Sequence, residues 1–507
     1  MIRSFRNLPM VFNKKMIGAT MSKQSEKNYK ILNHLPDMTG RSISRILSEL
    51  TLNTLNADIP ESSYAAATKM LLDTIACAYA GMHAPGIAEI VDLEEELSAK
   101  GNGTVFFNGK KLALPSAAFC NAAMIHAMDF DNNYPEADIH ILSIVVPIAL
   151  VCAEAERQNG LDCLSSIILG VETAARIAKP YIAAKRQHSY FLTTSLVGGW
   201  GGVATAARLR GLTLEETVNA MGIYYAHTCG NRQALLEKTL TKRIQPAIAA
   251  KAALYSVMLA QKGFTGSEHV FEGPGGFYRC YTQDSPPEAE IFRVPPKPFG
   301  IEELVVKQFP TCGIHHACIA SALQLKREYG IQYKDIERVE FFLQEGGGTL
   351  VSMPFREDSI PQIAAQFCAP YAIALALNKG EVHIRDFSNE AITRDRNTID
   401  LAKRTIECTC FADMRLKDYP AVKAGCRYIK VCLRNNKILS HEYSSANFCD
   451  ASAMDMLRVE DKFRQCLSMN GEICLTTASK IIEAVKDFQK TENISEFVSL
   501  LKSEATI

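Results

Sequence analysis

The sequence predicts a mainly α-helical fold in which a large all-α domain is joined to a smaller α+β domain. Alanine-rich apolar segments with helical spacing follow one another from about residue 41 to residue 263. Turn signals rich in glycine and proline then break this pattern at 272–277 and at 295–298. β-like runs are found only beyond these breaks, where they are mixed with helices, and this mixture is typical of an α+β domain.

The expected elements follow from this patterning. The first long helix begins after Pro60, close to the acidic Glu61, and ends at Gly81, which are ordinary start and stop signals. The helices expected before the break cover 64–81, 116–128, 143–156, 161–178, 198–210, 215–226 and 247–263. The strands expected after it cover 303–309, 336–343, 428–433 and 438–443, with helices at 316–329, 363–377 and 482–501.

The length and composition indicate more than one hydrophobic core. The chain has 507 residues, of which 47% are hydrophobic and 22% charged, so two or three folded units are expected. We predict an N-terminal extension over 1–40, a helical domain made of 41–290 and 451–505, and an α+β domain over 291–450. The last helical segment is expected to pack back onto the first.

Charge and cysteine usage exclude several functions. Lys plus Arg and Asp plus Glu both number 55, so the basic surplus usual in nucleic-acid-binding proteins is missing. A local cluster of cations can still bind a small anion. None of the 16 cysteines forms a CxxC pair, which favours a reducing compartment without a cysteine zinc site. No apolar run is long enough to predict a membrane span.

The first 24 residues are basic and contain no acidic residue, since the first one is Glu26. This composition resembles a mitochondrial transit peptide, which predicts a matrix protein. A disordered tail or translation from Met21 are the alternatives, and the protein would then be cytoplasmic.

Three polar clusters could carry chemistry. The first lies between two apolar helices and contains Asp129, Asp131 and His140, which are residue types that move protons. A solvated loop with helix-capping residues is the alternative. The second is Lys242–Arg243, expected just before a helix that starts near Ala247. Cations at a helix N-terminus oppose the helix dipole, so this placement suggests a bound anion, although a surface basic patch fits as well.

The third cluster runs from Lys307 through Cys312 to His315 and His316, at a turn that leads into a helix. Adjacent histidines point apart on a helix, so we do not expect both to bind one metal ion. A purely structural turn is the alternative. Together the clusters supply lysines that can hold carboxylates and histidines that can deliver a proton near neutral pH.

Several motifs, in order, resemble the MmgE/PrpD family, which includes 2-methylcitrate dehydratases, cis-aconitate decarboxylases and an iminodisuccinate epimerase. The matching segments are 57–60, 72–81, 126–131, 140, 143–147, 170–174, 271–276, 307–312 and 363–371. The resemblance implies a helical domain built from both chain ends, with the α+β domain as a lid over an active site between them. It also implies a homodimer that needs no metal or organic cofactor.

The family's functional positions carry over as follows. Asp129, His140 and Cys312 are expected to be catalytic, with the cysteine standing where many members have histidine. The expected substrate-binding residues are Lys242, Lys307, Asp131 and His316.

Three departures from the family pattern affect acid–base capacity. Leu192 and Pro246 stand where related enzymes often carry histidine, and Asn132 replaces an aspartate. His188 could substitute for the first of these histidines only if the loop around it differs.

The resemblance therefore implies a lyase that acts on a small polycarboxylate. Decarboxylation of cis-aconitate, or of an alkyl homologue, to an itaconate-type product and CO2 is the first expectation. Loss of two family histidines weighs more against dehydration of 2-methylcitrate or another alkylcitrate, because that reaction needs two acid–base groups. Epimerisation of a dicarboxylate and a non-catalytic polycarboxylate-binding homologue are the remaining alternatives.

Overall fold

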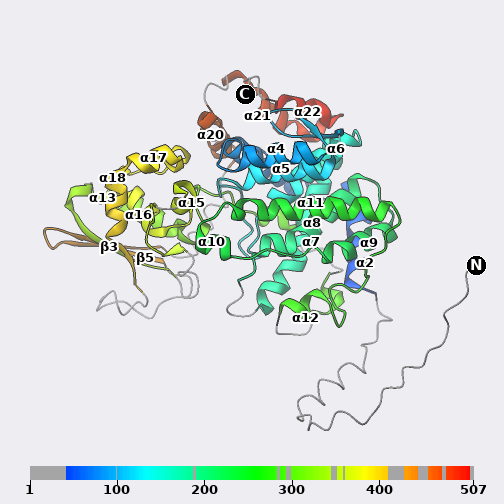
Figure 1. Cartoon of the computed structure of the whole chain (residues 1–507), viewed down its shortest axis with the longest axis horizontal. Coiled ribbons are helices and arrows are strands. Elements are labelled where there is room, and N and C mark those ends of the chain that lie inside the picture. Colours follow the sequence, from blue (N-terminus) through cyan, green and yellow to red (C-terminus); the bar gives the residue numbers. More distant parts are fainter. Residues whose placement is uncertain are drawn as a thin grey trace, which may run out of the picture.

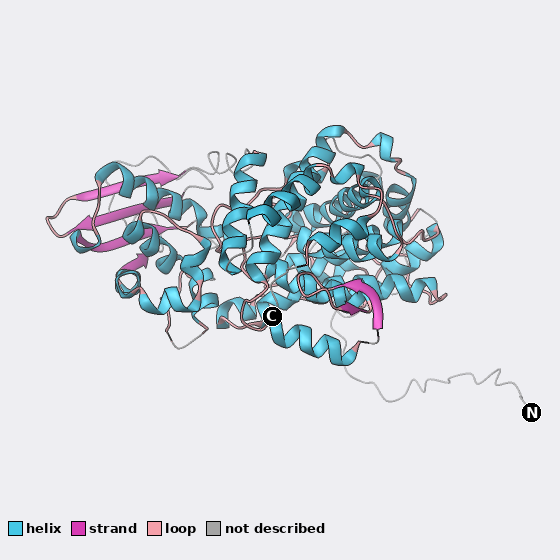
Figure 2. Cartoon of the chain, turned by 90° about the horizontal axis from the view of Figure 1, so that it is seen from above, coloured by secondary structure: helices cyan, strands magenta, loops and turns pink. Residues whose placement is uncertain are grey.

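The protein has a large helical part and a smaller part built on a four-stranded sheet, as predicted (Figures 1 and 2). The computed structural model describes residues 41–98, 100–185, 190–282, 286–292, 298–343, 351–357, 360–408, 427–443, 455–470 and 475–502. The basic N-terminal segment, on which the targeting prediction rests, and His188 lie outside these residues. None of the helices in the described ranges is long and apolar enough to span a membrane.

The helical part begins with a succession of helices that includes the expected ones. These are α2 (Ile43–Asn53), α3 (Glu61–Gly81), α4 (Ile87–Leu97), α5 (Leu114–His126), α6 (Leu142–Ala155), α7 (Gly160–Ala184), α8 (Thr193–Leu209), α9 (Leu214–Tyr225), α10 (Gln233–Glu237), α11 (Thr241–Gln261) and α12 (Phe277–Tyr281). Of these helices, α4, α10 and α12 were not predicted. A short two-stranded sheet of β1 (Lys100–Thr104) and β2 (Lys111–Leu112), which the sequence analysis did not predict, lies between α4 and α5.

Helices from the C-terminus pack onto the first ones (Figure 1). Here α20 (Met456–Leu467) and α21 (Leu475–Lys486) contact α3, while α22 (Ile494–Leu500) contacts α6. The single helix expected over 482–501 is thus two helices. The side chain of Asn493 accepts a hydrogen bond from the Ser495 N–H and so starts the second one. The limits of the predicted domains and the predicted homodimer stay predictions.

Small residues let the central helices approach closely. A Cβ atom added to Gly201 of α8 would lie 2.5 Å from the carbonyl oxygen of Gly170 in α7, so only glycine fits there. This close crossing packs α8 into the core, where most of its residues are buried. The N-terminus of α8, with Thr194, is thereby held beside the loop that follows α5.

The smaller part is an α+β arrangement. Its elements are α13 (His316–Tyr329), β3 (Ile336–Phe342), α15 (Pro361–Gln366), α16 (Ala369–Lys379), α17 (Asn389–Arg394), α18 (Arg396–Lys403), β4 (Thr405–Glu407), β5 (Arg427–Leu433) and β6 (Ile438–Tyr443). The strand order is β4-β3-β5-β6, with β4 parallel to β3 and the other pairs antiparallel. Both α13 and α16 contact this sheet, which buries Val339 and Val431.

Two expected elements of the smaller part are wrong. The run 303–309 is not a strand, because Val305 exchanges two backbone hydrogen bonds (2.8 and 2.9 Å) with Asn133 of the helical part and does not join the sheet. The helix expected over 363–377 is broken between α15 and α16. Pro370 near the start of α16 has no N–H to donate and disfavours a helical conformation in the residue before it.

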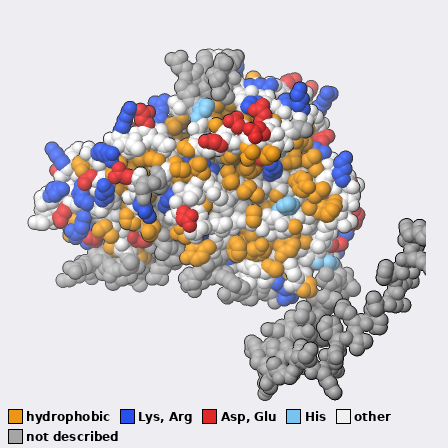
Figure 3. All heavy atoms as spheres, in the orientation of Figure 1, with side chains coloured by type: hydrophobic (Ala, Val, Ile, Leu, Met, Phe, Trp, Pro, Cys, Tyr) orange, Lys and Arg blue, Asp and Glu red, His pale blue; other side chains and the backbone are white. Residues whose placement is uncertain are grey.

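The surface of the helical part is rich in apolar side chains on one face (Figure 3). Two residues of α11, Ile248 and Tyr255, are 37% and 49% exposed. Acidic and basic side chains of both signs are interspersed around this face, in keeping with the zero net charge (Figure 3).

Candidate active site

The loop between α5 and α6 carries the first polar cluster, and it is fixed at several points. Asp129 has a φ of 50°, in the left-handed region that side chains other than glycine seldom adopt. Further along, Tyr134 donates its backbone N–H to the carbonyl of Ile139 at 2.9 Å. The loop is therefore a built structure, and its aspartate is held in an unfavourable backbone conformation by what surrounds it.

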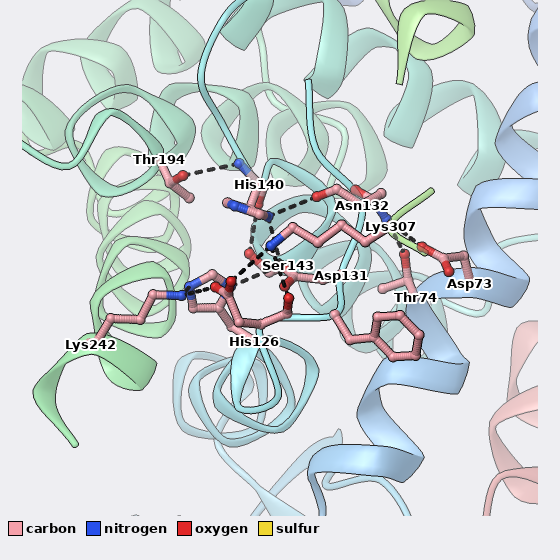
Figure 4. A network of polar contacts seen from close by, with 12 residues as sticks. Asp73, Thr74, His126, Asp131, Asn132, His140, Ser143, Thr194, Lys242 and Lys307 are labelled. Carbon is pink, nitrogen blue, oxygen red and sulfur yellow. Dashed lines mark hydrogen bonds and ion pairs between the residues drawn. The ribbon is translucent and has the colours of Figure 1, made fainter. Parts of the chain in front are cut away.

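Two lysines, which are labelled in Figure 4, hold the Asp129 carboxylate. Lys242 donates to Oδ1, and Lys307 donates at 2.9 Å both to Oδ2 and to the backbone carbonyl of the same residue. All three side chains are 5% exposed or less. Burial by itself would raise the pKa of Asp129, but the charges of Lys242 and Lys307 hold it well below its usual range. The carboxylate is thus ionised and shared by two cations.

His126, paired with Asp131, orients one of these lysines. The Nδ1 atom of His126 lies 2.9 Å from Oδ2 of Asp131, and its Nε2 atom lies 2.8 Å from Nζ of Lys242. The hydrogen-bond network assigns the ring proton to Nδ1, so that Nε2 accepts from the ammonium group. Burial lowers the pKa of His126, which keeps the ring neutral for this role. The ring of Phe367 lies 4.7 Å from the same ammonium group.

His140 is held from both sides of its backbone and through its ring (Figure 4). Its N–H donates to Oγ1 of Thr194 at 3.0 Å, and its carbonyl accepts from Oγ of Ser143 at 2.7 Å. Its Nδ1 atom donates to the carbonyl of Asn132 at 2.9 Å. The sequence analysis expects a histidine whose pKa lies near neutral pH, and the structure differs from this expectation. Burial, together with the nearby charge of Lys307, lowers the pKa of His140 to about 3.

These residues line one cavity of about 130 Å³ between the two parts of the chain. Of the residues proposed from sequence, Asp129, His140, Lys242, Lys307 and Cys312 all face it. The other described residues of its wall are His126, Asn133, Asp138, Leu192, Thr194, Arg232, Leu235, Gly313, Ile314, Val351 and Phe367.

Two proposed residues do not face this cavity. Asp131 is wholly buried and approaches the histidines, at 2.9 Å from His126 and 3.5 Å from His140. His316 directs its Nε2 atom to the carbonyl of Thr311 at 3.1 Å. The expected direct contact of Asp131 and His316 with substrate is therefore not supported by their positions. Both become candidates for holding other groups in place.

Cys312 occupies the wall as a thiol. Burial raises its pKa, so the sulfur carries its proton at neutral pH. Its backbone N–H donates to the carbonyl of Gln366 at 3.0 Å, and the Gln366 side chain donates to the carbonyl of Met128 at 2.8 Å. These bonds join the smaller part to the loop that carries Asp129.

The three departures from the family pattern have different structural consequences. Leu192 faces the cavity and makes that stretch of the wall apolar. Pro246 lies inside α11, and the cavity wall described above does not include it. The amide of Asn132 donates at 3.2 Å to Oγ1 of Thr74 and at 3.4 Å to Oδ2 of Asp73. An aspartate at position 132 would instead place two carboxylates side by side.

The anion-binding interpretation of α11 needs one correction. The helix starts at Thr241, about two turns before the expected Ala247, so Lys242 lies within its first turn. The anion that Lys242 meets is Asp129 of the neighbouring loop. This tertiary contact compensates the unfavourable position of a cation at a helix N-terminus.

Sequence reasoning missed several residues of the wall. His126 was part of the quoted motif but was given no role, although it lies three residues before Asp129, a spacing that puts both on one side of a helical turn. Phe367 lies in the matching segment 363–371 but was given no role, and Thr194 and Arg232 stand in no recognisable pattern. Only the tertiary fold brings them to the cavity.

One group of side chains has the composition of a metal site. Ligand atoms of His126, Asp131 and His140 lie within 4.8 Å of one another. The donor set does not fit a cation, because both Nδ1 atoms carry protons that they donate to Asp131 and to the Asn132 carbonyl. The ammonium group of Lys242 already occupies the other nitrogen of His126 and would repel a metal ion.

The comparison with protein families shows which family the chain belongs to. The MmgE/PrpD N-terminal domain matches residues 45–290, and the MmgE/PrpD C-terminal domain matches residues 309–487. The chain belongs to the MmgE/PrpD family. The Asp129 loop and Lys242 fall within the first match, whereas Cys312 falls within the second. The cavity therefore lies between the two domains of this family.

Curated relatives match this MmgE/PrpD protein over most of its length. A cis-aconitate decarboxylase-like protein of Aspergillus oryzae is 25% identical over 471 residues, 88% of this chain and 95% of that protein. A cis-aconitate decarboxylase of Aspergillus terreus is 26% identical over 377 residues, 69% of this chain and 75% of that protein. A cis-aconitate decarboxylase of Mus musculus is 23% identical over 450 residues, 86% of this chain and 88% of that protein.

Proposed function

We propose that this protein is a cofactor-independent carboxy-lyase that converts cis-aconitate, or an alkyl homologue, to an itaconate-type product and CO2. One observation carries the proposal. Lys242 and Lys307 share the carboxylate of Asp129 in the cavity wall, so two ammonium groups and this one carboxylate face the cavity, while the second carboxylate, Asp131, lies behind the histidines. Such a site attracts the carboxylates of a small polyanion. The names of the relatives agree with this choice of substrate.

The reaction requires few groups of the protein. The bond between the carboxymethyl carbon and its carboxylate breaks, CO2 leaves, and the electron pair stays on the allylic carbon. It delocalises through the double bond to the far carbon, next to that carbon's carboxylate. A proton added there gives the product. The protein must pin the two remaining carboxylates, stabilise the developing charge and supply one proton.

Each group has a role in this scheme. Lys242 and Lys307 bind a carboxylate next to the carbon on which charge develops, and Asp129 keeps the two ammonium groups together. His126, backed by Asp131, orients Lys242. His140 delivers the proton. The unliganded ring is neutral, but a bound trianion raises the pKa of a nearby imidazole, so His140 takes up a proton when substrate binds.

Cys312 is the second candidate for proton delivery. Its thiol faces the same cavity and is already protonated in the unliganded protein. His140 is preferred because the hydrogen bond from its Nδ1 atom to the Asn132 carbonyl fixes the ring, whereas the described contacts of Cys312 hold its backbone.

The apolar wall at Leu192 favours decarboxylation over dehydration of an alkylcitrate. Dehydration removes a C–H proton with a base and protonates the leaving hydroxyl group with an acid, so it needs two titratable groups in place. Decarboxylation needs one proton donor. A leucine at this point of the wall leaves no acid–base group there, and in this scheme dehydration needs such a second group whereas decarboxylation does not.

The experiment is a substrate panel in D₂O with the purified full-length protein, followed by NMR and mass spectrometry. Cis-aconitate should yield itaconate with one solvent deuterium on its saturated methylene, together with CO2. Lys242→Ala should abolish turnover, whereas Lys262→Ala, an exposed lysine at the end of the same helix, should not. Conversion of 2-methylcitrate to an alkene would instead establish a dehydratase. Recovery of every acid unchanged would sink the proposal.

A further inference from the structure

We propose that Arg232 is a further substrate-binding residue, which anchors a carboxylate at a second point of the cavity, apart from Lys242 and Lys307. The inference rests on the proposed function only in assuming that a polycarboxylate binds in this cavity. It assigns a role to a cation that neither the motifs nor the spacing singled out.

The position of Arg232 is fixed by its backbone. Its N–H donates to the carbonyl of Tyr190 at 2.7 Å, and the Leu192 N–H donates to the carbonyl of Gly230 at 3.3 Å. Phe191 and Asn231 form an antiparallel bridge between them. The two short segments 190–192 and 230–232 therefore pair, and together they bring Leu192 and Arg232 to the cavity wall.

The charges around Arg232 leave one cation uncompensated. Its Nη2 atom lies 2.7 Å from Oδ2 of Asp138, and Nζ of Lys185 lies 3.8 Å from the same oxygen. Two cations thus share one carboxylate, as Lys242 and Lys307 share Asp129. Of these three side chains, Arg232 and Asp138 line the cavity, so the wall offers a further cation, apart from Lys242 and Lys307, to a ligand with several carboxylates.

The guanidinium group still has donors to offer. It has five N–H donors in a planar fork, whereas a lysine offers only a point charge. In the described part of the chain, the Nε atom has no hydrogen-bond partner. The Nε atom itself is buried, so a ligand reaches the group through the rest of the side chain, which is 19% exposed. A carboxylate that competes with Asp138 would gain the bidentate pairing that arginine favours.

Apolar side chains complete this stretch of the wall. Leu192 and Leu235 line the cavity with Arg232. Leu235 is buried and belongs to α10, the short helix that Arg232 precedes. They offer a surface for the carbon skeleton of a ligand whose carboxylates reach the charged points. This combination of apolar lining and few polar anchors is usual for small-molecule sites.

Calorimetric titration with tricarballylate tests the anchor without turnover, because this saturated tricarboxylate lacks the double bond that the reaction needs. Arg232→Gln should weaken binding by roughly 10- to 100-fold, the usual loss for a hydrogen bond to a charged group. Arg232→Lys keeps the charge but not the planar fork of donors. Its affinity for tricarballylate should fall between those of the unaltered protein and Arg232→Gln. With cis-aconitate, Arg232→Gln should raise KM more than it lowers kcat.

Asp138→Asn separates a binding role from a structural one. If Asp138 competes with the ligand for Arg232, removing its charge should tighten tricarballylate binding about 2- to 10-fold, opposite in sign to Arg232→Gln. In the double variant this gain should vanish, because the two changes act through one contact. A loss of affinity in both single variants, as expected when an ion pair merely supports the wall, would overturn the proposal.

The outcomes distinguish the two proposals. Binding of tricarballylate that depends on Arg232, without turnover of cis-aconitate, overturns the proposed reaction and keeps the anchor. Equal affinities of the unaltered protein and Arg232→Gln overturn the anchor and keep the reaction. Absence of binding by the unaltered protein overturns the anchor whatever the reaction. An unchanged thermal unfolding midpoint of Arg232→Lys shows that the affinities compare folded proteins.

Discussion

Lys307 donates two hydrogen bonds to Asp129, one to its carboxylate and one to its backbone carbonyl, and both measure 2.9 Å. The lysine lies in the segment that leads into α13 of the smaller part, whereas the aspartate belongs to a loop of the helical part. The contact therefore joins the two parts at the cavity and supports the left-handed backbone of Asp129. It also places the lysine charge where a substrate carboxylate would have to bind.

Asp129→Asn should separate substrate binding from catalysis. The amide has nearly the shape of the carboxylate but no charge, so both lysines become more available to an anion. Tricarballylate should bind as tightly as before or more tightly, while kcat for cis-aconitate falls roughly 100-fold because the ammonium groups lose their common anchor. Titration calorimetry and steady-state kinetics measure the two quantities. Asp461→Asn, on an exposed residue of α20, is the matched control. An unchanged kcat would refute the role given to Asp129.

Acidification should destabilise the protein between pH 7 and pH 5. Burial lowers the pKa values of His140 and His316 to about 3, below the value of about 6.5 in an unfolded chain. In this window the unfolded state therefore binds more protons, so stability is present above pH 6.5 and is lost as the pH falls. The slope is at most about 1.4 kcal/mol per pH unit for each histidine.

Urea unfolding at several pH values measures this slope. His316→Gln should make it shallower, because glutamine has no proton to bind. His83→Gln, which alters an exposed histidine, serves as the control and should leave the slope as it is. The carboxylate of Asp129 contributes only at lower pH, since its unfolded pKa is about 3.9. Parallel curves for His316→Gln and the unaltered protein would contradict the assignment.

Proton delivery can be assigned by comparing two substitutions. His140→Gln should lower kcat for cis-aconitate by about 10²- to 10⁴-fold, the usual contribution of a general acid. Cys312→Ser should lower it by less than about tenfold, since the cavity keeps its shape and its neutral charge at that point. Deuterium incorporation from solvent checks that the residual product forms by the same route. The reverse order of the two losses would transfer the role to Cys312.

Local patterns predicted the helices well because apolar spacing and end signals act over a few residues. The range 316–329 is a helix over the same residues, and the strands near 336–343 and 428–433 form one sheet. The predicted type or bounds of an element are wrong where contacts with residues far away in the sequence are involved. Val305 pairs with Asn133 of the helical part, and Lys242 in the first turn of α11 forms an ion pair with Asp129.

The site was predictable to the extent that motifs carried it. Asp129, Lys242 and Lys307 converge although they are far apart in the chain, and sequence order alone gives no distance between them. The direction of a side chain was beyond reach, so Asp131 was expected at the cavity and instead lies behind the two histidines. Arg232 belongs to no motif, and only the pairing of its segment with Tyr190 brings it to the wall.

A buried ion pair supports the same loop from its other side. Lys462 of α20 lies 2.6 Å from Oδ1 of Asp73 in α3, and it donates at 2.8 Å to the carbonyl of Phe130. Its ammonium group also lies 3.7 Å from the Phe130 ring. Asn132, whose carbonyl accepts from His140, reaches Asp73 with its amide. Helix α20 is thus linked to His140 through Phe130 and Asn132 of the loop.

Replacing Lys462 with methionine should therefore reduce both stability and activity. Removal of one partner leaves the Asp73 carboxylate buried without compensation, which costs about 3–5 kcal/mol in the free energy of unfolding. In the double variant with Asp73→Asn most of this loss should be recovered, because no charge remains buried. Urea unfolding measures both values, and Lys480→Met, an exposed lysine of α21, is the control. If the two single losses simply add in the double variant, the pair does not act as a unit. The loop would then depend on each residue separately.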